Sequence, residues 1–273
     1  MTVFEAILLG IVEGLTEFLP VSSTGHLTIT EGLLGLDVDS DAITAFTAVI
    51  QFGAIVAVLV YFRTDILRLL GAVVRGARSP ELRHGPDWRE AWLVAAGSIP
   101  IGIVGLAAKD FITGPLRSLW VVGVALIAWS GVMVWAEGRA QQNRGEAQLS
   151  LRDALIIGTV QCVALVPGVS RSGATISAGL VRGLDRVTAT RLSFLLAIPA
   201  LTAAGALELK DALGSGVGAG VTLVGTVVSF FVAYASIAWL LRFVAHNPIT
   251  WFVPYRIGLG VLVLLVLTVE TVT

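Results

Sequence analysis

The sequence predicts an all-α integral membrane protein. We expect a polytopic helical bundle of about six full transmembrane helices plus two re-entrant helical hairpins, arranged as an inverted-topology repeat. Three observations lead to this fold class. The chain of 273 residues is 56% hydrophobic and only 14% charged, whereas a soluble domain is nearer a quarter charged. Long apolar segments recur along the chain, and two further apolar regions are interrupted halfway by small and polar residues.

Six apolar segments approach the roughly 20 residues that a helix needs to cross a bilayer. In chain order they are 43–62, 91–108, 118–136, 190–207, 217–241 and 254–272. The regions 3–30 and 153–181 each contain a cluster of Gly, Ser, Thr and Pro. We expect both to be re-entrant hairpins, because irregular backbone is tolerated at membrane depth only where it is buried in protein or lines a cavity. The whole chain, 1–273, is predicted to be one membrane domain.

Lysine and arginine placement predicts the orientation of the bundle. If residues 63–90 are cytoplasmic, alternation of the spans places three further stretches on the same side, namely 138–152, 182–191 and 242–256. These four stretches hold 14 of the 18 basic residues. Arg256, near the start of the last helix, is expected to be a cytoplasmic anchor. Arg171 is then the one basic residue that the predicted topology cannot place at a membrane surface.

A shift of 148 positions aligns the two broken regions without gaps. It places Val21-Ser22 on Val169-Ser170 and Gly35-Leu36-Asp37 on Gly183-Leu184-Asp185. The loops that follow the two regions are predicted on opposite sides of the membrane, so repeats at about 1–137 and 149–273, joined by the cytoplasmic loop 138–152, would be inverted. Inverted repeats with broken helices converge on a site near the midplane. A chance match of abundant small residues is the competing explanation.

Arg171 lies within the second broken region. An unpaired guanidinium at membrane depth costs at least about 2.5–3.5 kcal/mol, so a partner is expected. Irregular backbone with free N–H groups is typical of an anion cradle, and the guanidinium adds a fork of donors for phosphate. The expected substrate ligands beside Arg171 are Gly168, Ser170, Ser172, Gly173 and Thr175. Helix packing by small residues is the alternative, but it does not account for Arg171.

Glu13 and Glu17 are spaced i, i+4 and share one helix face in the first broken region. Two adjacent carboxylates in a medium of low dielectric need a cation between them, and Mg²⁺ or Ca²⁺ shared with phosphate oxygens would serve. Protonation or snorkelling of one carboxylate is the alternative. Ser23 is a candidate nucleophile and His26 a candidate acid/base, although a buried histidine is often only a structural hydrogen-bonding group. The neighbouring hydroxyls expected to bind substrate are Ser22 and Thr24.

Composition also excludes several classes of function. A net charge of −1 leaves no basic surplus for nucleic acid. A single cysteine, Cys162, excludes an internal disulfide and a cysteine-based metal site, and three scattered histidines argue against a zinc centre. The N-terminus lacks a basic leader and a cleavage site, so we expect it to belong to the mature protein.

Two motifs resemble the signatures of a known family. The runs Glu13-Gly-Leu-Thr-Glu17-Phe-Leu-Pro-Val-Ser-Ser-Thr-Gly-His26 and Pro167-Gly-Val-Ser-Arg-Ser-Gly-Ala-Thr175 resemble those of bacterial undecaprenyl-diphosphatase, once named for bacitracin resistance. The resemblance covers essentially the whole chain. It implies hydrolysis of undecaprenyl diphosphate to the monophosphate and inorganic phosphate, which recycles the lipid carrier of cell-wall synthesis. It also implies a divalent metal and an active site that opens to the periplasmic side of the inner membrane.

The resemblance carries roles onto individual residues. Glu13 and Glu17 would bind metal or activate the nucleophile. Ser22, Ser23 and His26 would line the reaction centre, and three residues of the second motif would grip the diphosphate, namely Ser170, Arg171 and Thr175. Whether Ser23, His26 or water attacks phosphorus stays open, with attack by Ser23 and His26 as acid/base slightly favoured.

Two other classes of function compete with the enzyme. A flippase for a phosphorylated lipid or an anion transporter would also use an inverted repeat with broken helices, but has little use for Glu13, Glu17 and His26 together. A purely structural membrane scaffold would not need Arg171. In the enzyme hypothesis, a polyprenyl diphosphate lipid arrives laterally from the membrane. A homodimer is compatible with this arrangement.

Overall fold

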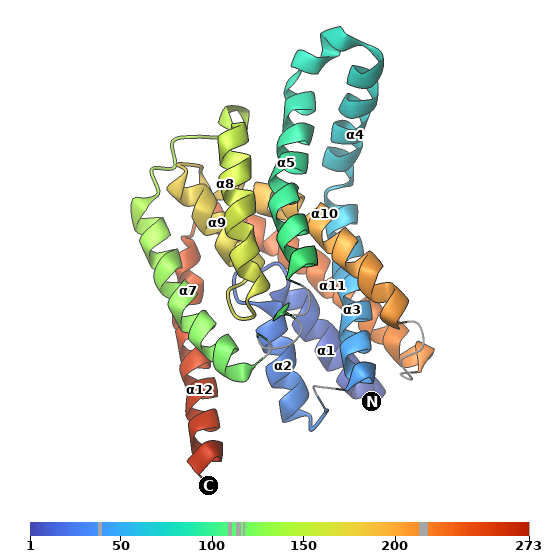
Figure 1. Ribbon diagram of the computed structural model, residues 1–273, viewed down its shortest axis with the longest axis vertical. Coiled ribbons are helices and arrows are strands. Elements are labelled where there is room, and N and C mark those ends of the chain that lie inside the picture. Colours follow the sequence, from blue (N-terminus) through green and yellow to red (C-terminus); the bar gives the residue numbers. More distant parts are fainter. Residues whose placement is uncertain (38–39, 109–110, 113–115, 117, 213–217, 273) are drawn as a thin grey trace.

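The computed structural model describes residues 1–37, 40–108, 111–112, 116, 118–212 and 218–272. Helices make up every regular element within these ranges (Figure 1). The α-helices are α1 (Val3–Thr16), α2 (Ser23–Leu33), α3 (Asp41–Tyr61), α4 (Arg63–Arg78), α5 (Pro86–Ala107), α7 (Leu119–Arg139), α8 (Leu151–Gln161), α9 (Arg171–Val181), α10 (Arg186–Ala212), α11 (Ala219–Val244) and α12 (Val253–Val272). Short 3₁₀ helices are η1 (Pro80–His84), η3 (Glu146–Gln148), η4 (Cys162–Leu165) and η5 (Ile249–Phe252).

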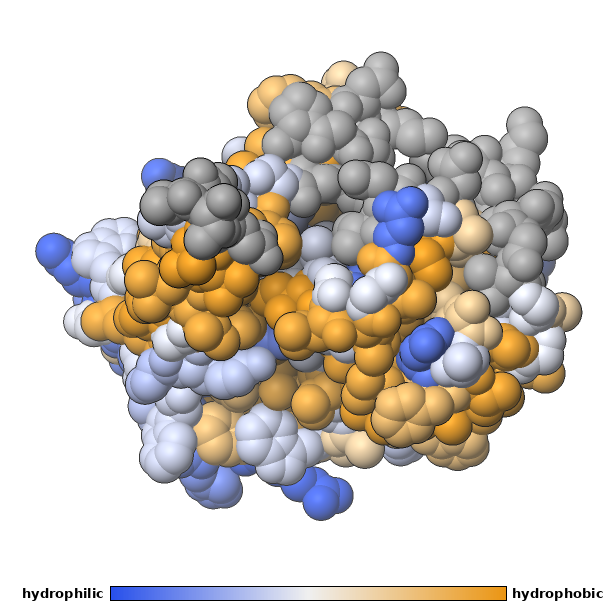
Figure 2. Space-filling model, turned by 90° about the horizontal axis from the view of Figure 1, so that it is seen from below, coloured by the Kyte–Doolittle hydropathy of each residue, from blue (hydrophilic) through white to orange (hydrophobic). Residues whose placement is uncertain are grey.

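Six helical segments in the described part of the chain are long and apolar enough to cross a membrane. They are Ala42–Tyr61, Pro86–Ala107, Leu119–Arg139, Arg186–Ala206, Ala219–Val244 and Ile249–Val269. Each coincides with one predicted segment to within about five residues, so the predicted all-α membrane fold with six spans is confirmed. Hydrophobic residues also cover much of the face seen from below (Figure 2). Large apolar side chains are also exposed along the spanning helices, among them Leu106, Val124 and Leu262, which suits contact with hydrocarbon.

Glycines set the closest helix contacts of the bundle. A Cβ atom on Gly10 of α1 would lie 2.5 Å from the carbonyl oxygen of Gly225 on α11. A Cβ atom on Gly158 of α8 would collide with the carbonyl oxygen of Gly97 on α5. Because lipid tails are as apolar as leucine side chains, helices in a membrane associate through such close packing of small residues. The two broken regions are therefore pressed against full-length helices.

Helix bounds and residues with positive φ recur at the predicted spacing of 148 residues. The bounds of α2 and α9 differ by 148 at both ends. Ser22 and Ser170, which precede these helices, both have positive φ, at 79° and 76°, and such values are uncommon for residues other than glycine. After the helices, Gly35 and Gly183 have φ of 69° and 81°. These matches support an internal repeat.

The starts of α1 and α8 repeat in the same way. Thr2 and Glu5 form a capping box at α1, and Ser150 and Asp153 form the equivalent one at α8. The opposite orientation of the two repeats in a membrane, and the re-entrant character of α1–α2 and α8–α9, stay predictions.

Residues 63–90, expected only to be a cytoplasmic loop, form a helical hairpin. Helix α4 and the first turns of α5 project beyond the other helices at the top of the molecule (Figure 1). Arg68 joins the two helices through Asp87 at 2.5 Å and Glu90 at 2.9 Å. The ring of Trp88 lies directly against Gly76. Hydropathy did not reveal this hairpin, because α4 is amphipathic and carries several arginines.

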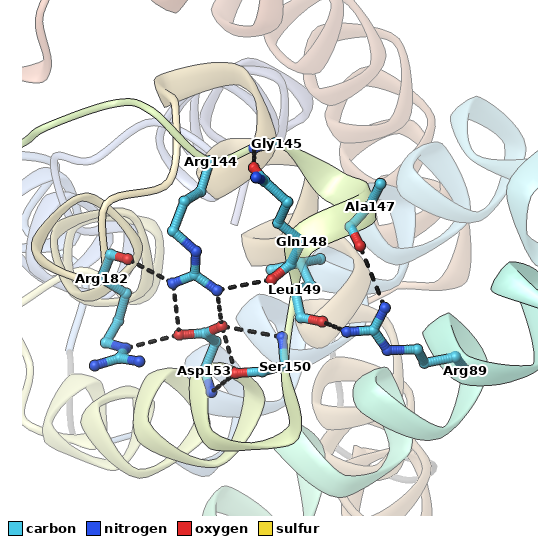
Figure 3. Close-up of polar contacts among 9 residues, drawn as sticks. All are labelled: Arg89, Arg144, Gly145, Ala147, Gln148, Leu149, Ser150, Asp153 and Arg182. Atoms are coloured by element: carbon cyan, nitrogen blue, oxygen red, sulfur yellow. Dashed lines mark hydrogen bonds and ion pairs between the residues drawn. The ribbon is translucent and has the colours of Figure 1, made fainter.

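The connecting segment 138–152 is held by a buried carboxylate (Figure 3). Asp153 is fully buried. It binds Arg144 at 2.6 Å and Arg182 at 2.7 Å and accepts the hydroxyl of Ser150 at 2.6 Å. Burial alone would raise the pKa of the Asp153 carboxyl, but the hydrogen bonds from Arg144, Ser150 and Arg182 outweigh it and hold the pKa well below its usual range. The cluster ties the connecting segment to both α8 and the end of α9.

Asp153→Asn should remove a pH-dependent contribution to stability. Since the pKa of the folded state lies below the unfolded value of about 3.9, the wild-type carboxylate stabilises the fold fully above that pH and loses this contribution as the pH falls further. We expect the variant to lose about 2 kcal/mol at neutral pH, less than a fully buried ion pair, because both arginines are partly exposed. Thermal unfolding from pH 7 to pH 3 measures the effect.

The exposed Glu81→Gln is the matched control for Asp153→Asn. It should retain both the stability at neutral pH and the acid sensitivity of wild type. Equal pH dependence of Asp153→Asn and wild type would contradict the assignment.

Candidate active site

The acidic pair lies at the end of α1, where the first broken region leaves its helix. Glu17 is the C-cap residue, and its N–H donates to the carbonyl oxygen of Glu13 at 2.9 Å. The backbone is therefore still helical at Glu17, and the two side chains share a face as predicted. Both residues are buried, at 1% and 8% exposed. The chain thus places two carboxylates at the point where the regular backbone stops.

Glu17 joins the two broken regions. Its Oε1 atom accepts from Nη2 of Arg171 at 2.5 Å, and its Oε2 atom accepts the hydroxyl of Ser23 at 2.5 Å. Ser23 is the first residue of α2 and Arg171 is the first residue of α9. The partner expected for the buried guanidinium is thus an acidic residue of the other motif. Hydroxyl, carboxylate and guanidinium meet in one place, and groups of these kinds can supply the nucleophile, the base and the charge neutralisation used in phosphoryl transfer.

The turns before α2 and α9 are hydrogen-bonded to each other. The N–H of Gly168 donates to Oγ of Ser22 at 3.0 Å, and the hydroxyl of Ser170 donates to the carbonyl oxygen of Leu19 at 3.4 Å. Gly168 has φ of 99°, and a Cβ atom there would lie 2.6 Å from the carbonyl oxygen of Val122. Only glycine fits this position. The predicted phosphate ligands Ser22, Gly168 and Ser170 therefore also hold the two turns together.

The remaining predicted ligands differ in their surroundings. Thr175 is fully buried, and its hydroxyl donates to Oγ of Ser193 on α10 at 2.6 Å. Ser172 is also buried, and its Oγ atom lies 3.1 Å from Oγ of Ser170. Gly173 donates its N–H to the same Oγ of Ser170 at 3.2 Å. These three residues stabilise the start of α9. Thr24 is exposed.

The structure brings His26 to Tyr255 and not to Ser23. Because the carbonyl oxygen of Ser22 only accepts, the Nδ1 atom of His26, 2.6 Å away, carries the proton. In a neutral ring Nε2 then accepts from the hydroxyl of Tyr255 at 2.7 Å. The two rings also stack, with centroids 5.6 Å apart. The partner of the Ser23 hydroxyl among the described residues is Glu17, so Glu17 is the base placed to receive its proton.

Arg256 is not the surface anchor that the sequence predicted. It is fully buried, and its guanidinium donates to the carbonyl oxygens of Pro20 at 2.8 Å, Gly168 at 2.9 Å and Val169 at 3.1 Å. Its Nε atom also donates to the hydroxyl of Ser130 at 3.1 Å. Arg171 is therefore not alone among the basic residues in lying away from a membrane surface.

The error about Arg256 has a simple origin. The apolar run suggested a helix from residue 254, whereas the spanning segment already begins at Ile249. Five residues displace a helical position by about 7.5 Å, so Arg256 lies deeper than predicted. An arginine within a span, seven residues from its start, is the signal that would have identified it.

The described residues contain no cluster of three or more His, Cys, Asp or Glu side chains suited to a metal. The donor set of this site is the carboxylate pair Glu13 and Glu17. Hard oxygen ligands of this kind fit Mg²⁺ or Ca²⁺, and Mg²⁺ commonly takes one or two carboxylates together with substrate phosphates and water. Glu13 and Glu17 therefore fit a divalent cation whose remaining ligands come from the substrate and from water.

Comparison with known proteins bears on the whole chain. The family model described as "Bacitracin resistance protein BacA" matches residues 6–262. Undecaprenyl-diphosphatase 3 of Frankia casuarinae is 60% identical over 267 residues, which is 97% of this chain and 96% of the relative. Undecaprenyl-diphosphatase 1 of Streptomyces coelicolor is 59% identical over 263 residues, which is 96% of this chain and 95% of the relative. The undecaprenyl-diphosphatase of Cutibacterium acnes is 51% identical, and the alignment covers 100% of this chain and 100% of the relative. The family predicted from the two motifs is confirmed.

Arg256→Met should destabilise the fold markedly. Methionine is long and apolar, but it leaves the carbonyl oxygens of Pro20, Gly168 and Val169 without this donor. Buried polar groups that lose a partner cost about 1–3 kcal/mol each, so we expect a loss of at least about 3 kcal/mol. Thermal unfolding of the purified protein in detergent measures it. The exposed Arg152→Met is the control, and equal stability of the two variants would contradict the role given to Arg256.

Proposed function

The chain belongs to the BacA family of bacitracin resistance proteins, and from this premise we propose that it hydrolyses undecaprenyl diphosphate to undecaprenyl phosphate and inorganic phosphate. The names of its relatives support this activity. The observation that carries the proposal is the contact of one buried carboxylate, Glu17, with both a hydroxyl and a guanidinium. Together these three groups provide a nucleophile, a base and a phosphate ligand.

Arg171 is proposed to bind the diphosphate. Its side chain is 16% exposed, and one of its nitrogens is held by Glu17. The other donors of the fork are then available to the oxygens of the transferred phosphoryl group, where they neutralise charge in the transition state. Arg171 is also the first residue of α9, and the positive end of that helix dipole favours an anion there. Binding at this point would bring the terminal phosphorus toward Ser23, the other partner of Glu17.

Ser23 is proposed as the nucleophile, with Glu17 as its base. Glu17 accepts the hydroxyl proton as Ser23 Oγ forms a bond to the terminal phosphorus. The bond from that phosphorus to the bridging oxygen breaks, and undecaprenyl phosphate leaves with the electron pair. Water then hydrolyses the phosphoserine and releases inorganic phosphate. His26 fixes the carbonyl of Ser22 beside the nucleophile and is proposed to orient it.

A divalent cation, Mg²⁺ or Ca²⁺, is part of the proposal. Glu13 and Glu17 would hold it, since both carboxylates are buried on one face of α1. When bound, such an ion neutralises phosphate charge and polarises the phosphorus–oxygen bonds.

The apolar outer surface of the bundle supports lateral access. The substrate carries a long hydrocarbon chain, and the bundle exposes large apolar side chains such as Leu262 and Leu265 along α12. We propose that the lipid enters from the bilayer of the bacterial inner membrane and that the site opens toward the periplasm. The basic loops on the other side support this orientation through the positive-inside rule. A homodimer stays a prediction.

Purified protein with Mg²⁺ should release inorganic phosphate from a polyprenyl diphosphate in detergent, and a chelator should stop the release reversibly. Ser23→Ala should lower turnover by about 10³-fold or more, because it removes the nucleophile. Ser98→Ala should leave turnover unchanged, because the hydroxyl of Ser98 donates to the carbonyl of Val94 on its own helix and Ser98 is not among the site residues. Normal turnover in Ser23→Ala would refute the nucleophile. Substrate moved intact across sealed vesicles, without cleavage, would refute the phosphatase in favour of a transporter.

Arg171→Lys should also fail as an enzyme although it preserves the charge. A compact ammonium group cannot bind Glu17 and a phosphate with the geometry of a planar fork. We expect turnover to fall by about 10²-fold or more, with thermal stability close to wild type. Phosphate release and unfolding are measured on the same preparation. Turnover within a few-fold of wild type would show that Arg171 acts only as a point charge.

A further inference from the structure

We propose that the end of the bundle opposite the predicted periplasmic face carries a second phosphate-binding site, a pocket for the head group of an anionic membrane lipid. The pocket lies between α3, α10 and α11. It has a volume of about 520 Å³ and is lined by Tyr61, Val187, Arg191, Leu241, Arg242, Ala245 and His246. It is open on one side, because Arg242, Ala245 and His246 are exposed. The pocket shares no residue with the site around Arg171, so the proposal does not depend on the proposed function.

The lining of the pocket is basic. Arg191 is held in place by Asp65, whose Oδ1 atom lies 3.1 Å from Nη2, and its guanidinium stacks 5.5 Å from the ring of Phe62. Arg242 and His246 are spaced i, i+4 at the end of α11, and both are exposed. The lining residues, all of which the structure describes, include no acidic side chain. Asp65 and Glu146, the latter 4.0 Å from Nε of Arg191, balance the charge of Arg191, so Arg242 supplies the surplus positive charge that would attract an anion.

The position of the pocket along the helices matches the level of lipid head groups. Tyr61 is the last residue of α3, and Arg242 lies in the last turn of α11. Exposed tryptophans surround this end of the bundle. Trp239 and Trp251 are 48% and 65% exposed, and both rings contact Phe243. Tryptophans of this kind are enriched at the boundary between hydrocarbon and water.

The chemistry of the walls indicates a lipid. Arg191, Arg242 and the hydroxyl of Tyr61 offer donors to a phosphate, whereas Val187, Leu241 and Ala245 offer apolar contact. A ligand that uses both surfaces carries an anionic head and a hydrocarbon chain. Basic pockets between transmembrane helices on the cytoplasmic side are known to bind such head groups.

The test uses the full-length protein in detergent with phosphatidylglycerol. The double variant Arg242→Gln/His246→Gln removes two basic groups of the pocket and leaves the ion pair of Arg191 intact. The matched control is Arg139→Gln, an exposed arginine in the last turn of α7 that does not line the pocket. Native mass spectrometry counts the lipids that each protein retains. We expect the double variant to retain at least about fivefold less phosphatidylglycerol than wild type or the control.

Two further arms identify the ligand class. Zwitterionic phosphatidylcholine should be retained poorly by all three proteins, and millimolar inorganic phosphate should not displace phosphatidylglycerol from wild type. Equal retention of phosphatidylglycerol by wild type and the double variant would overturn the proposal. Displacement by inorganic phosphate would overturn the assignment to a lipid. Phosphate release should remain at the wild-type rate in the double variant, which separates this site from the site around Arg171.

Discussion

The carbonyl groups at the two helix breaks impose the constraint on which the site depends. Where α1 and α8 end inside the bundle, backbone oxygens lose their helical partners, and a buried carbonyl group needs another donor. Arg256 meets this need, because its guanidinium binds Pro20 of the first break and Gly168 and Val169 of the second. Helix α12 delivers it by packing against α7, where Gly260 and Gly123 allow close approach. The guanidinium of Arg256 thus joins the two helix breaks.

With the breaks fixed, the reactive groups follow from local geometry. A residue with positive φ, Ser22 or Ser170, turns the chain into each new helix. The first residues of those helices, Ser23 and Arg171, therefore face a common point, and Glu17 occupies it. The ion pair of Glu17 and Arg171 offsets the cost of burying a guanidinium. A buried pair adds little net stability compared with apolar side chains, so its presence is better explained by chemistry than by folding.

The sequence was most informative where composition determines structure. Long apolar runs predicted all six spans, and the cost of an unpaired charge predicted a partner for Arg171. It was least informative where a contact depends on three-dimensional register. Nothing in the chain indicated that Tyr255 would reach His26 across 229 positions. Proximity along the chain suggested that His26 serves Ser23, but the imidazole turns back to the carbonyl of Ser22 one turn earlier. Helix α4 was missed because its apolar residues alternate with arginines.

The repeat explains how one site acquires two kinds of chemistry. A shift of 148 residues relates the capping boxes, the positive-φ serines and the bounds of α2 and α9, as the predicted repeat requires. The side chains that it presents are not duplicated. Glu17 corresponds to Leu165 and His26 to Ala174, while Arg171 corresponds to Ser23. One copy therefore supplies the carboxylates and the hydroxyl, and the other supplies the cation. Because Glu17 and Arg171 come from different halves of the chain, each charge finds its partner only when both halves assemble the site.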